Sequence, residues 1–431
     1  MNKKLQWSTV QKKIIDLVPQ SKNPRKMSAK QTADLKRSLK SFGLVEIPVI
    51  DTDGTIIAGA QRLRVLQLLG KEQNIIDVRI PNRKLSDEER DKYMIASNAI
   101  DGSWDFDKLK VFTPELLLDV GFDPIDLSKI WDKDIAVEDD NFDEQKELEN
   151  IKKTDIELGD VIVMDKHRLI CGDSTNDKTL QKLFSGDRCA MIYSDPIYNI
   201  DLDYNKGVGG KQNYGGSVQD KRTDSEYTDL MRKSIECALS VSHEDTHVYY
   251  WADQSYIWLF QTLYKELGIQ NRRVCLWVKN GFSPTPSVAY NKAYEPCIYG
   301  TRGKPFLTAK KDLMEILNKD IGNGNATLDD IWAVKRLSSS KYEHATSKPP
   351  QLHEKAILRC TKPTDIILDS FAGSGSTLIA CEQLQRRAYC VELEPVFCEL
   401  IKNRWEKLTG KKAKIVKSNE KSQKETVHTT D

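Results

Sequence analysis

The segment that most constrains the fold is a short apolar run, residues 366–368, which ends on Asp369 and opens into a loop of small residues. The loop reads Phe-Ala-Gly-Ser-Gly-Ser-Thr (371–377), a helical segment follows it, and a second apolar run ends on Glu392. Glycines let a backbone approach a ligand closely at the top of a parallel sheet, and an acid at the next strand end can accept from ribose hydroxyls. This succession of strand, glycine turn, helix and acidic strand end predicts a nucleotide-type site.

The ligand predicted for this loop lacks a pyrophosphate. A phosphate-cradling loop would carry Gly-Lys-Ser/Thr, and the dinucleotide fingerprint would carry a third glycine, but this loop has neither. The candidate ligand-binding residues of the segment are Asp369, Phe371, Gly373, Gly375, Ser376, Thr377 and Glu392.

A second apolar run ends on a different motif. Residues 191–194 lead directly into Asp195-Pro196-Ile197-Tyr198-Asn199. Taken alone, the motif is read equally well as a turn, because Asp-Pro commonly starts one. A carboxylate and an aromatic ring at a strand end also suit a catalytic site. This motif alone therefore does not distinguish a turn from a catalytic site.

Together the two motifs resemble those of the DNA amino-methyltransferases that use S-adenosylmethionine. In that family the cofactor motif reads D-x-F-x-G-x-G-T/S and the catalytic motif D/N/S-P-P-Y/F/W; the corresponding segments are DSFAGSGS (369–376) and DPIY (195–198). The resemblance covers nearly all of residues 156–412 and includes HRLICGDSTN (167–176) and HATSKPPQLHEKAILRCTKP (344–363). A catalytic motif that precedes the cofactor loop is the order of the circularly permuted β class.

This order implies a Rossmann-like α/β domain with a mostly parallel sheet and a target-recognition region at about residues 272–341. The region carries 12 Lys or Arg against 6 Asp or Glu, in a chain that is nearly balanced at 65 basic and 64 acidic residues. A basic segment is usually a solvated face, but it is also the footprint expected of a polyanion. Arg272 and Arg273 are therefore candidate DNA contacts.

The resemblance also implies roles for the catalytic motif. The Asp195 carboxylate and the Pro196 carbonyl would accept the two hydrogens of an exocyclic base amine, and Tyr198 would stack on the base. The family's second proline is Ile197 here, so the peptide carbonyl is kept while the fixed φ of proline is lost. Such a transfer needs no metal.

Three further residues are expected beside the cofactor, namely Asp173, Lys348 and Pro349. Asp173 would contact the adenine end of S-adenosylmethionine or only cap a turn. Lys348, followed by Pro349, would line the cofactor pocket or be solvated. The glycine-rich segment 207–216 would be a lid over the flipped base or a plain connector.

The first hundred residues predict a separate small α/β domain. NPRK (23–26), LKSFGLVEIPVI (39–50) and GTIIAGAQRLRVLQLLG (54–70) resemble the N-terminal domain of ParB-type partition proteins, which is also fused to phage and prophage methyltransferases. The nucleotide-binding box of that family, typically Gly-Glu/His-Arg-Arg, is here Gly59-Ala60-Gln61-Arg62. Arg62 and Arg64 would grip nucleotide or DNA, or simply be solvated.

Composition and motif spacing divide the chain into five parts. We expect a ParB-like domain at residues 1–102, a helical extension at 103–135, an acidic linker at 136–155, a methyltransferase domain at 156–413 and a disordered tail at 414–431. The nine cysteines include no C-x-x-C pair, which argues against a zinc ribbon, and no apolar stretch is long enough to span a membrane. A cytoplasmic protein is therefore expected.

These observations predict a DNA adenine-N6 methyltransferase that acts on double-stranded DNA. Aspartate at the first motif position with tyrosine at the fourth is the commoner adenine pattern in the family, whereas serine at the first position is typical of cytosine-N4 enzymes. Three alternatives stay open: cytosine N4 as the target, a partition-like binding protein with a decayed catalytic domain, and an RNA substrate. The sequence also leaves open a homodimer and a cognate restriction nuclease.

Overall fold

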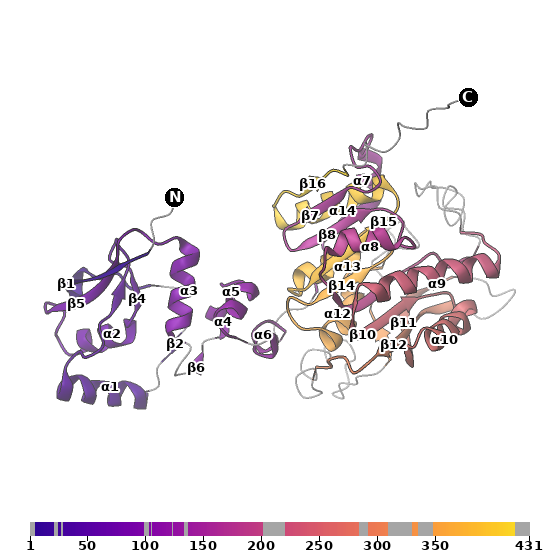
Figure 1. Ribbon diagram of the computed structural model, residues 1–431. Coiled ribbons are helices and arrows are strands. Elements are labelled where there is room, and N and C mark those ends of the chain that lie inside the picture. The colour runs from indigo at the N-terminus through magenta and orange to yellow at the C-terminus, as the bar shows by residue number, and fades with distance from the viewer. Residues whose placement is uncertain are drawn as a thin grey trace, which may run out of the picture. The chain divides into compact units, whose positions relative to one another are not determined.

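The chain folds into two compact units, Met1–Trp131 and Asp132–Asp431 (Figure 1). The computed structural model describes residues 5–20, 25–26, 29–98, 103–104, 106–122, 124–132, 137–200, 220–283, 292–308, 330–334 and 348–418. The glycine-rich segment 207–216 and much of the predicted target-recognition region lie outside the described residues.

The first unit is built on a sheet whose described strands follow the order β1-β5-β3-β4. These strands are β1 (Trp7–Lys13), β3 (Val49–Ile50), β4 (Ile56–Ala58) and β5 (Ile75–Pro81), and the helices with them are η1 (Ile14–Asp16), α1 (Ala29–Phe42), α2 (Ala60–Leu68) and α3 (Asp87–Asn98). Leu39 of α1 and Leu63 of α2 pack with Ile50 in one core. Gly43 follows α1 with φ +72° and Gly54 lies in the β3–β4 turn with φ +85°, as their positions in the sequence predict.

The predicted helical extension forms the last part of the first unit in sequence. Strand β2 (Arg25–Lys26) pairs with β6 (Ser103–Trp104), and the short helices α4 (Phe106–Leu109), α5 (Pro114–Asp119) and α6 (Pro124–Trp131) follow. Helix α5 has the expected start signals, because Pro114 stands at its first turn and the Thr113 hydroxyl accepts from the Leu116 backbone N–H at 3.2 Å.

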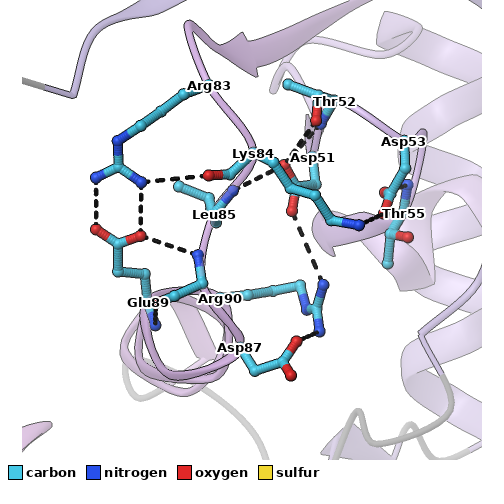
Figure 2. Close-up of polar contacts among 11 residues, drawn as sticks. Asp51, Thr52, Asp53, Thr55, Arg83, Lys84, Leu85, Asp87, Glu89 and Arg90 are labelled. Atoms are coloured by element: carbon cyan, nitrogen blue, oxygen red, sulfur yellow. Dashed lines mark hydrogen bonds and ion pairs between the residues drawn. The ribbon is translucent and has the colours of Figure 1, made fainter. Parts of the chain in front are cut away.

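A polar cluster fastens the β3–β4 turn of the first unit to the start of α3 (Figure 2). The buried Asp51 carboxylate accepts from the Leu85 backbone N–H (3.2 Å) and lies 3.8 Å from the Arg90 guanidinium. Arg83 and Glu89 form a two-point ion pair with distances of 2.8 and 2.7 Å. These contacts tie the turn to the start of the helix, although Asp51 Oδ2 and Arg90 Nε form no hydrogen bond within the described residues.

The second unit is organised around a large mixed sheet. Within the described residues its strand order is β13-β11-β12-β10-β9-β14-β15-β8-β7-β16. The strands are β7 (Val161–Met164), β8 (His167–Cys171), β9 (Cys189–Ser194), β10 (Ser242–Trp251), β11 (Gln270–Ser283), β12 (Lys292–Arg302), β13 (Ile331–Ala333), β14 (Ile366–Asp369), β15 (Arg387–Glu392) and β16 (Lys414–Val416). The central strands β10, β9, β14, β15 and β8 are parallel, which confirms the predicted α/β fold class.

Helices cover both faces of this sheet. Helices α8 (Asp177–Phe184), α9 (Asp224–Ser240) and α10 (Ile257–Glu266), with the short η2 (Gln254–Tyr256), lie on one face, and α12 (Gln351–Cys360), α13 (Ser376–Gln383) and α14 (Pro395–Thr409) lie on the other. The strands serve both cores by alternation: Met191 and Tyr193 of β9 join one apolar cluster, whereas Ile192 joins the other.

The acidic segment is not the linker that its composition predicts. The backbone N–H of Val137 donates to Glu354 of α12 (3.0 Å), and helix α7 (Glu144–Asn150) follows. The buried Arg404 of α14 donates to Asp140 at 2.6 and 2.9 Å and to Glu144 at 3.1 Å. Because buried arginine needs carboxylate partners, these acids are internal parts of the second unit, which begins at Asp132.

The C-terminal boundary also differs from the prediction. Strand β16 (Lys414–Val416) pairs antiparallel with β7, so the sheet continues into the segment expected to be a disordered tail. Residues 419–431 lie outside the described residues. Among the helices that the structure describes, none is long and apolar enough to cross a membrane.

Candidate active site

The fold brings the two sequence motifs to the same edge of the sheet. Strands β9 and β14 are parallel neighbours, with Ile192 opposite Leu368, so the segments that follow them emerge side by side. The Ser370 backbone N–H donates to the Ser194 hydroxyl (3.1 Å), which ties the two strand ends together. Ligands of open α/β sheets bind at the carboxyl ends of the strands, and both predicted motifs lie there.

The catalytic motif is part of a compact polar cluster. Lys348 Nζ lies 2.6 Å from Asp195 Oδ2, 2.8 Å from the Tyr198 hydroxyl and 3.3 Å from Glu295 Oε2. The Tyr198 hydroxyl lies 3.1 Å from both Asp195 Oδ1 and Glu295 Oε2. Two carboxylates therefore share one ammonium and one hydroxyl.

Burial controls the protonation of this cluster. Burial raises the pKa of Asp195, and the Lys348 ammonium opposes that shift. Burial alone would lower the pKa of Lys348, but Asp195 and Glu295 outweigh it and raise the pKa, so Lys348 stays charged. The Asp195 side chain is 31% exposed, against 3% for Lys348 and 13% for Glu295. Asp195 is therefore the more accessible of the two carboxylates.

Two members of this cluster have contacts that the sequence does not predict. Lys348 is predicted to lie beside the cofactor, and the structure places its ammonium on the catalytic motif. Glu295 of β12 is not among the predicted site residues. Its position in the apolar run Tyr-Glu-Pro-Cys-Ile-Tyr is a signal that could have found it, because a carboxylate is unusual in such a run. Pro349 is buried, and its carbonyl accepts from Leu352 at the start of α12 (3.0 Å), which is a helix-entry role.

The glycine loop links β14, β15 and α13. Glu392 accepts from the Gly373 backbone N–H (2.8 Å), and Asp369 accepts from the Phe371 backbone N–H (3.1 Å). Burial raises the pKa of Asp369 to about 7 against a hydrogen bond from Thr377, and burial raises the pKa of Glu392 to about 7 as well. Carboxyl groups shifted this far at one sheet edge are typical of functional sites.

The residues of the loop fit S-adenosylmethionine. A Cβ added at Gly373 would meet no atom within 4 Å, so the backbone there faces open space that a ligand can use. Gly375 is required by the fold and not by a ligand, because its φ is +82° and an added Cβ would lie 3.0 Å from Ile401. Helix α13 begins after Gly375 without a side-chain cap, so its first N–H groups are available to a carboxylate.

A histidine that the sequence reasoning missed connects the two halves of the site. His353 Nε2 lies 2.9 Å from the Ser376 hydroxyl, and His353 Nδ1 lies 3.1 Å from the Tyr193 hydroxyl. Burial lowers the pKa of His353 to about 3, so the ring is neutral and donates through one nitrogen while it accepts through the other. Ser376 of the cofactor loop is thus joined to strand β9.

The remaining predicted residues lie at the surface. Asp173 is exposed and accepts from the Thr175 backbone N–H (2.8 Å), which is the turn-capping arrangement. Arg272 and Arg273 are exposed at the start of β11, and Arg272 Nε donates to Thr301 (2.9 Å). In the first unit, Arg62 is ion-paired with Glu46, whereas Arg64 is exposed.

Comparison with known proteins identifies the second unit. Residues 189–403, about half of the chain, match the DNA methylase family N6_N4_Mtase. The second unit belongs to this family. DNA is therefore its substrate class, S-adenosylmethionine is its methyl donor, and the acceptor is an amine, either adenine N6 or cytosine N4.

Curated relatives of the methylase domain are type II methyltransferases. M2.DpnII of Streptococcus pneumoniae is 26% identical over 59% of this chain and 98% of its own length. M.HpaI of Haemophilus parainfluenzae is 24% identical over 55% of this chain and 73% of its own length.

Solved structures similar to the chain include DNA methyltransferases and a ParB-N domain. The M1.HpyAVI–SAM complex is 20% identical with a TM-score of 0.40 and covers 55% of this chain and 97% of that chain. The cytosine-N4-specific PvuII DNA methyltransferase is 14% identical with a TM-score of 0.41 and covers 58% and 95%. A Pnob8-like ParB-N domain is 18% identical with a TM-score of 0.22 and covers 30% and 50%.

Proposed function

We propose that the protein methylates the exocyclic N6 amine of adenine in double-stranded DNA. The observation that carries the proposal is the placement of the partly exposed Asp195 and of Tyr198 at the end of β9, beside the glycine loop at the end of β14. Methyl acceptor and methyl donor can then meet at one sheet edge.

Asp195 and Pro196 supply the chemistry on the acceptor side. The amine of adenine is a weak nucleophile, because its lone pair is delocalised into the ring. When its two hydrogens are accepted by the Asp195 carboxylate and the Pro196 carbonyl, the nitrogen is favoured in the pyramidal form that can attack. The new N–C bond forms as the C–S bond breaks, the electron pair stays on sulfur, and the amine loses a proton on the Asp195 side.

Lys348 and Tyr198 hold Asp195 in the geometry for this step. A carboxylate oxygen has two acceptor positions, so Asp195 can receive an amine hydrogen while it keeps the Lys348 ammonium at 2.6 Å. The Tyr198 ring is then oriented by its hydroxyl contacts, and its face is proposed to stack on the flipped base. Unstacking the target costs a few kcal/mol, which the stacking and the new hydrogen bonds offset.

The glycine loop holds the donor side. S-adenosylmethionine supplies an electrophilic methyl group on a sulfonium. We assign Glu392 to the ribose hydroxyls and the uncapped start of α13, with Ser376, to the methionine carboxylate. The open side of Gly373 allows the ligand to approach the loop backbone.

We propose adenine and not cytosine as the target base because of the residues in the catalytic motif. The resemblance associates aspartate at the first position and tyrosine at the fourth with adenine enzymes, and Ser194 precedes the motif without replacing Asp195. For the first unit we propose a ParB-like accessory role in DNA contact, in which the exposed Arg64 takes part.

A matched pair of variants separates the two halves of the site. Asp195→Asn should lower methyl transfer from radiolabelled S-adenosylmethionine to DNA by about 100-fold or more, with cofactor affinity in calorimetry changed only a few-fold. Gly373→Val should abolish cofactor binding. Its control is Gly268→Val, which has a similar positive φ of +72° and the same open space away from the loop. Undiminished turnover of Asp195→Asn would remove that residue from the mechanism, and equal cofactor affinity of the two valine variants would place the cofactor elsewhere.

A further inference from the structure

The catalytic motif departs from the family pattern at Ile197, which stands where the family has its second proline. The Pro196 carbonyl, the acceptor proposed for the base amine, shares a peptide plane with the nitrogen of Ile197. Proline at position 197 would fix φ at about −65° and so hold that plane against the next one. Isoleucine leaves the rotation free, and contacts from elsewhere have to replace the restraint.

Tyr227 supplies such a contact. It lies on α9, is fully buried, and donates its hydroxyl hydrogen to the Ile197 carbonyl at 2.8 Å. Its ring packs against Tyr256 with the centroids 4.7 Å apart, so the hydroxyl is held in direction as well as in distance. Burial raises the pKa of Tyr227, which keeps the hydroxyl protonated and a donor.

The chain on the far side of Ile197 is anchored too. The Asn199 backbone N–H donates to Asp220 at 2.6 Å, and the Asn199 side chain donates to the Tyr256 hydroxyl at 2.7 Å. Asn199 has φ +55°, a left-handed conformation that these contacts stabilise. Because Asn199 is held in place, the hydrogen bond to the Ile197 carbonyl decides the conformation of the backbone before it.

We propose that Tyr227 is a positioning residue that takes over the work of the missing second proline. By holding the Ile197 carbonyl on α9, it holds the peptide plane that follows Ile197. Because strand β9 holds the chain on the other side up to Ser194, the rotation left to the Pro196 carbonyl is restricted. Tyr227 touches neither the base nor the cofactor and acts only through the motif backbone. The inference rests on the proposed function and adds to it a residue outside the motif.

The chain offers a close control for a purely structural role. Tyr264 of α10 is also fully buried, belongs to the same apolar cluster, and donates its hydroxyl hydrogen to a main-chain carbonyl, that of Ile298, at 3.1 Å. Tyr227→Phe and Tyr264→Phe each remove one buried hydrogen bond of the same type and keep the ring. Any effect that appears only in Tyr227→Phe therefore comes from the catalytic segment.

The decisive test is rescue by proline in the full-length protein. Tyr227→Phe should lower kcat by about ten-fold or more, because small misplacements of a reacting group are costly, while cofactor affinity stays unchanged and Tyr264→Phe keeps wild-type kcat. Adding Ile197→Pro to Tyr227→Phe should restore kcat to that of Ile197→Pro alone. Among the described residues no hydrogen bond uses the Ile197 N–H, so the proline substitution removes no hydrogen bond there.

Hydrogen exchange of the peptide that spans residues 195–200 gives a second measurement, independent of turnover. Exchange should be faster in Tyr227→Phe than in Tyr264→Phe and should slow again when Ile197→Pro is added. Equal kcat and equal exchange in the two phenylalanine variants would overturn the inference, as would a loss in Tyr227→Phe that proline does not repair. A wild-type protein without methyl transfer would contradict the proposed function, and the exchange comparison would still decide the role of Tyr227.

Discussion

The buried ion pair between Asp140 and Arg404 provides a quantitative test of where the methylase domain begins. Arg404 donates to both oxygens of Asp140, at 2.6 and 2.9 Å, and the side chains are only 1% and 3% exposed. The same guanidinium donates to the Ser374 carbonyl of the glycine loop at 3.0 Å. Asp140→Asn removes the charge and one of the two strong acceptors while it keeps the size of the side chain.

The expected loss of stability follows from the environment of Arg404. Removing one partner of a buried ion pair costs about 3–5 kcal/mol, because the other charge is left buried without compensation. Glu144 remains on Arg404 at 3.1 Å, and the new amide oxygen still accepts one hydrogen bond. We therefore expect a loss at the lower end of that range, about 3 kcal/mol. Affinity for S-adenosylmethionine should also fall, since Arg404 supports Ser374.

Equilibrium unfolding in urea, followed by tryptophan fluorescence, measures this loss. The transition of the methylase domain is the one that S-adenosylmethionine shifts, because a ligand at about 100 times its Kd adds about 2.7 kcal/mol. The control is Glu138→Gln, which makes the same change of charge on an exposed residue two positions earlier. If Asp140→Asn is as stable as Glu138→Gln, within about 0.5 kcal/mol, the acidic segment is a linker after all.

Three other outcomes follow from the site and from the division of the chain into two units. Lys348→Met should move the acidic limb of the kcat profile to higher pH, because the Lys348 cation favours ionised Asp195; an unmoved limb would show that the pair does not persist with DNA bound. His353→Gln should become more stable relative to wild type as pH falls from about 6.5 towards 4, by up to about 1.4 kcal/mol per pH unit. The reason is that the unfolded wild-type chain binds a proton on this histidine in that range, whereas the buried ring stays neutral down to about pH 3. If calorimetry gives parallel curves of stability against pH for the two proteins, the ring is not neutral in the folded state. Residues 132–431 alone should bind S-adenosylmethionine with wild-type affinity in calorimetry but with altered DNA affinity or site choice; loss of cofactor binding would show that the first unit is part of the same core.

The placement of the two motifs could be predicted because it depends on local rules. Two apolar runs that end on Asp369 and Glu392, with glycines between them, fit few arrangements. The usual one is a pair of adjacent parallel strands that bind a ligand at their carboxyl ends. In the structure β9 and β14 pair in parallel, which brings both motifs to that edge.

What the sequence could not reveal depends on partners far along the chain. Asp140 lies in a segment without apolar periodicity, and its burial depends on Arg404, 264 residues away. The sequence neighbours of Lys348 indicate a place beside the cofactor, but they do not reveal that its ammonium contacts Asp195, 153 residues away. The hydroxyl that holds Ile197 gives no signal either, since a buried tyrosine in a helix is an ordinary core residue.

Identification of the methylated base decides directly whether the protein forms N6-methyladenine. Wild-type protein and Asp195→Asn should be incubated with S-adenosylmethionine and unmethylated double-stranded DNA, and the DNA should be digested to nucleosides and analysed by mass spectrometry. We predict N6-methyldeoxyadenosine as the main product of the wild-type protein and none above background from the variant. N4-methyldeoxycytidine as the main product would contradict the adenine assignment, and equal products from both proteins would contradict the role of Asp195.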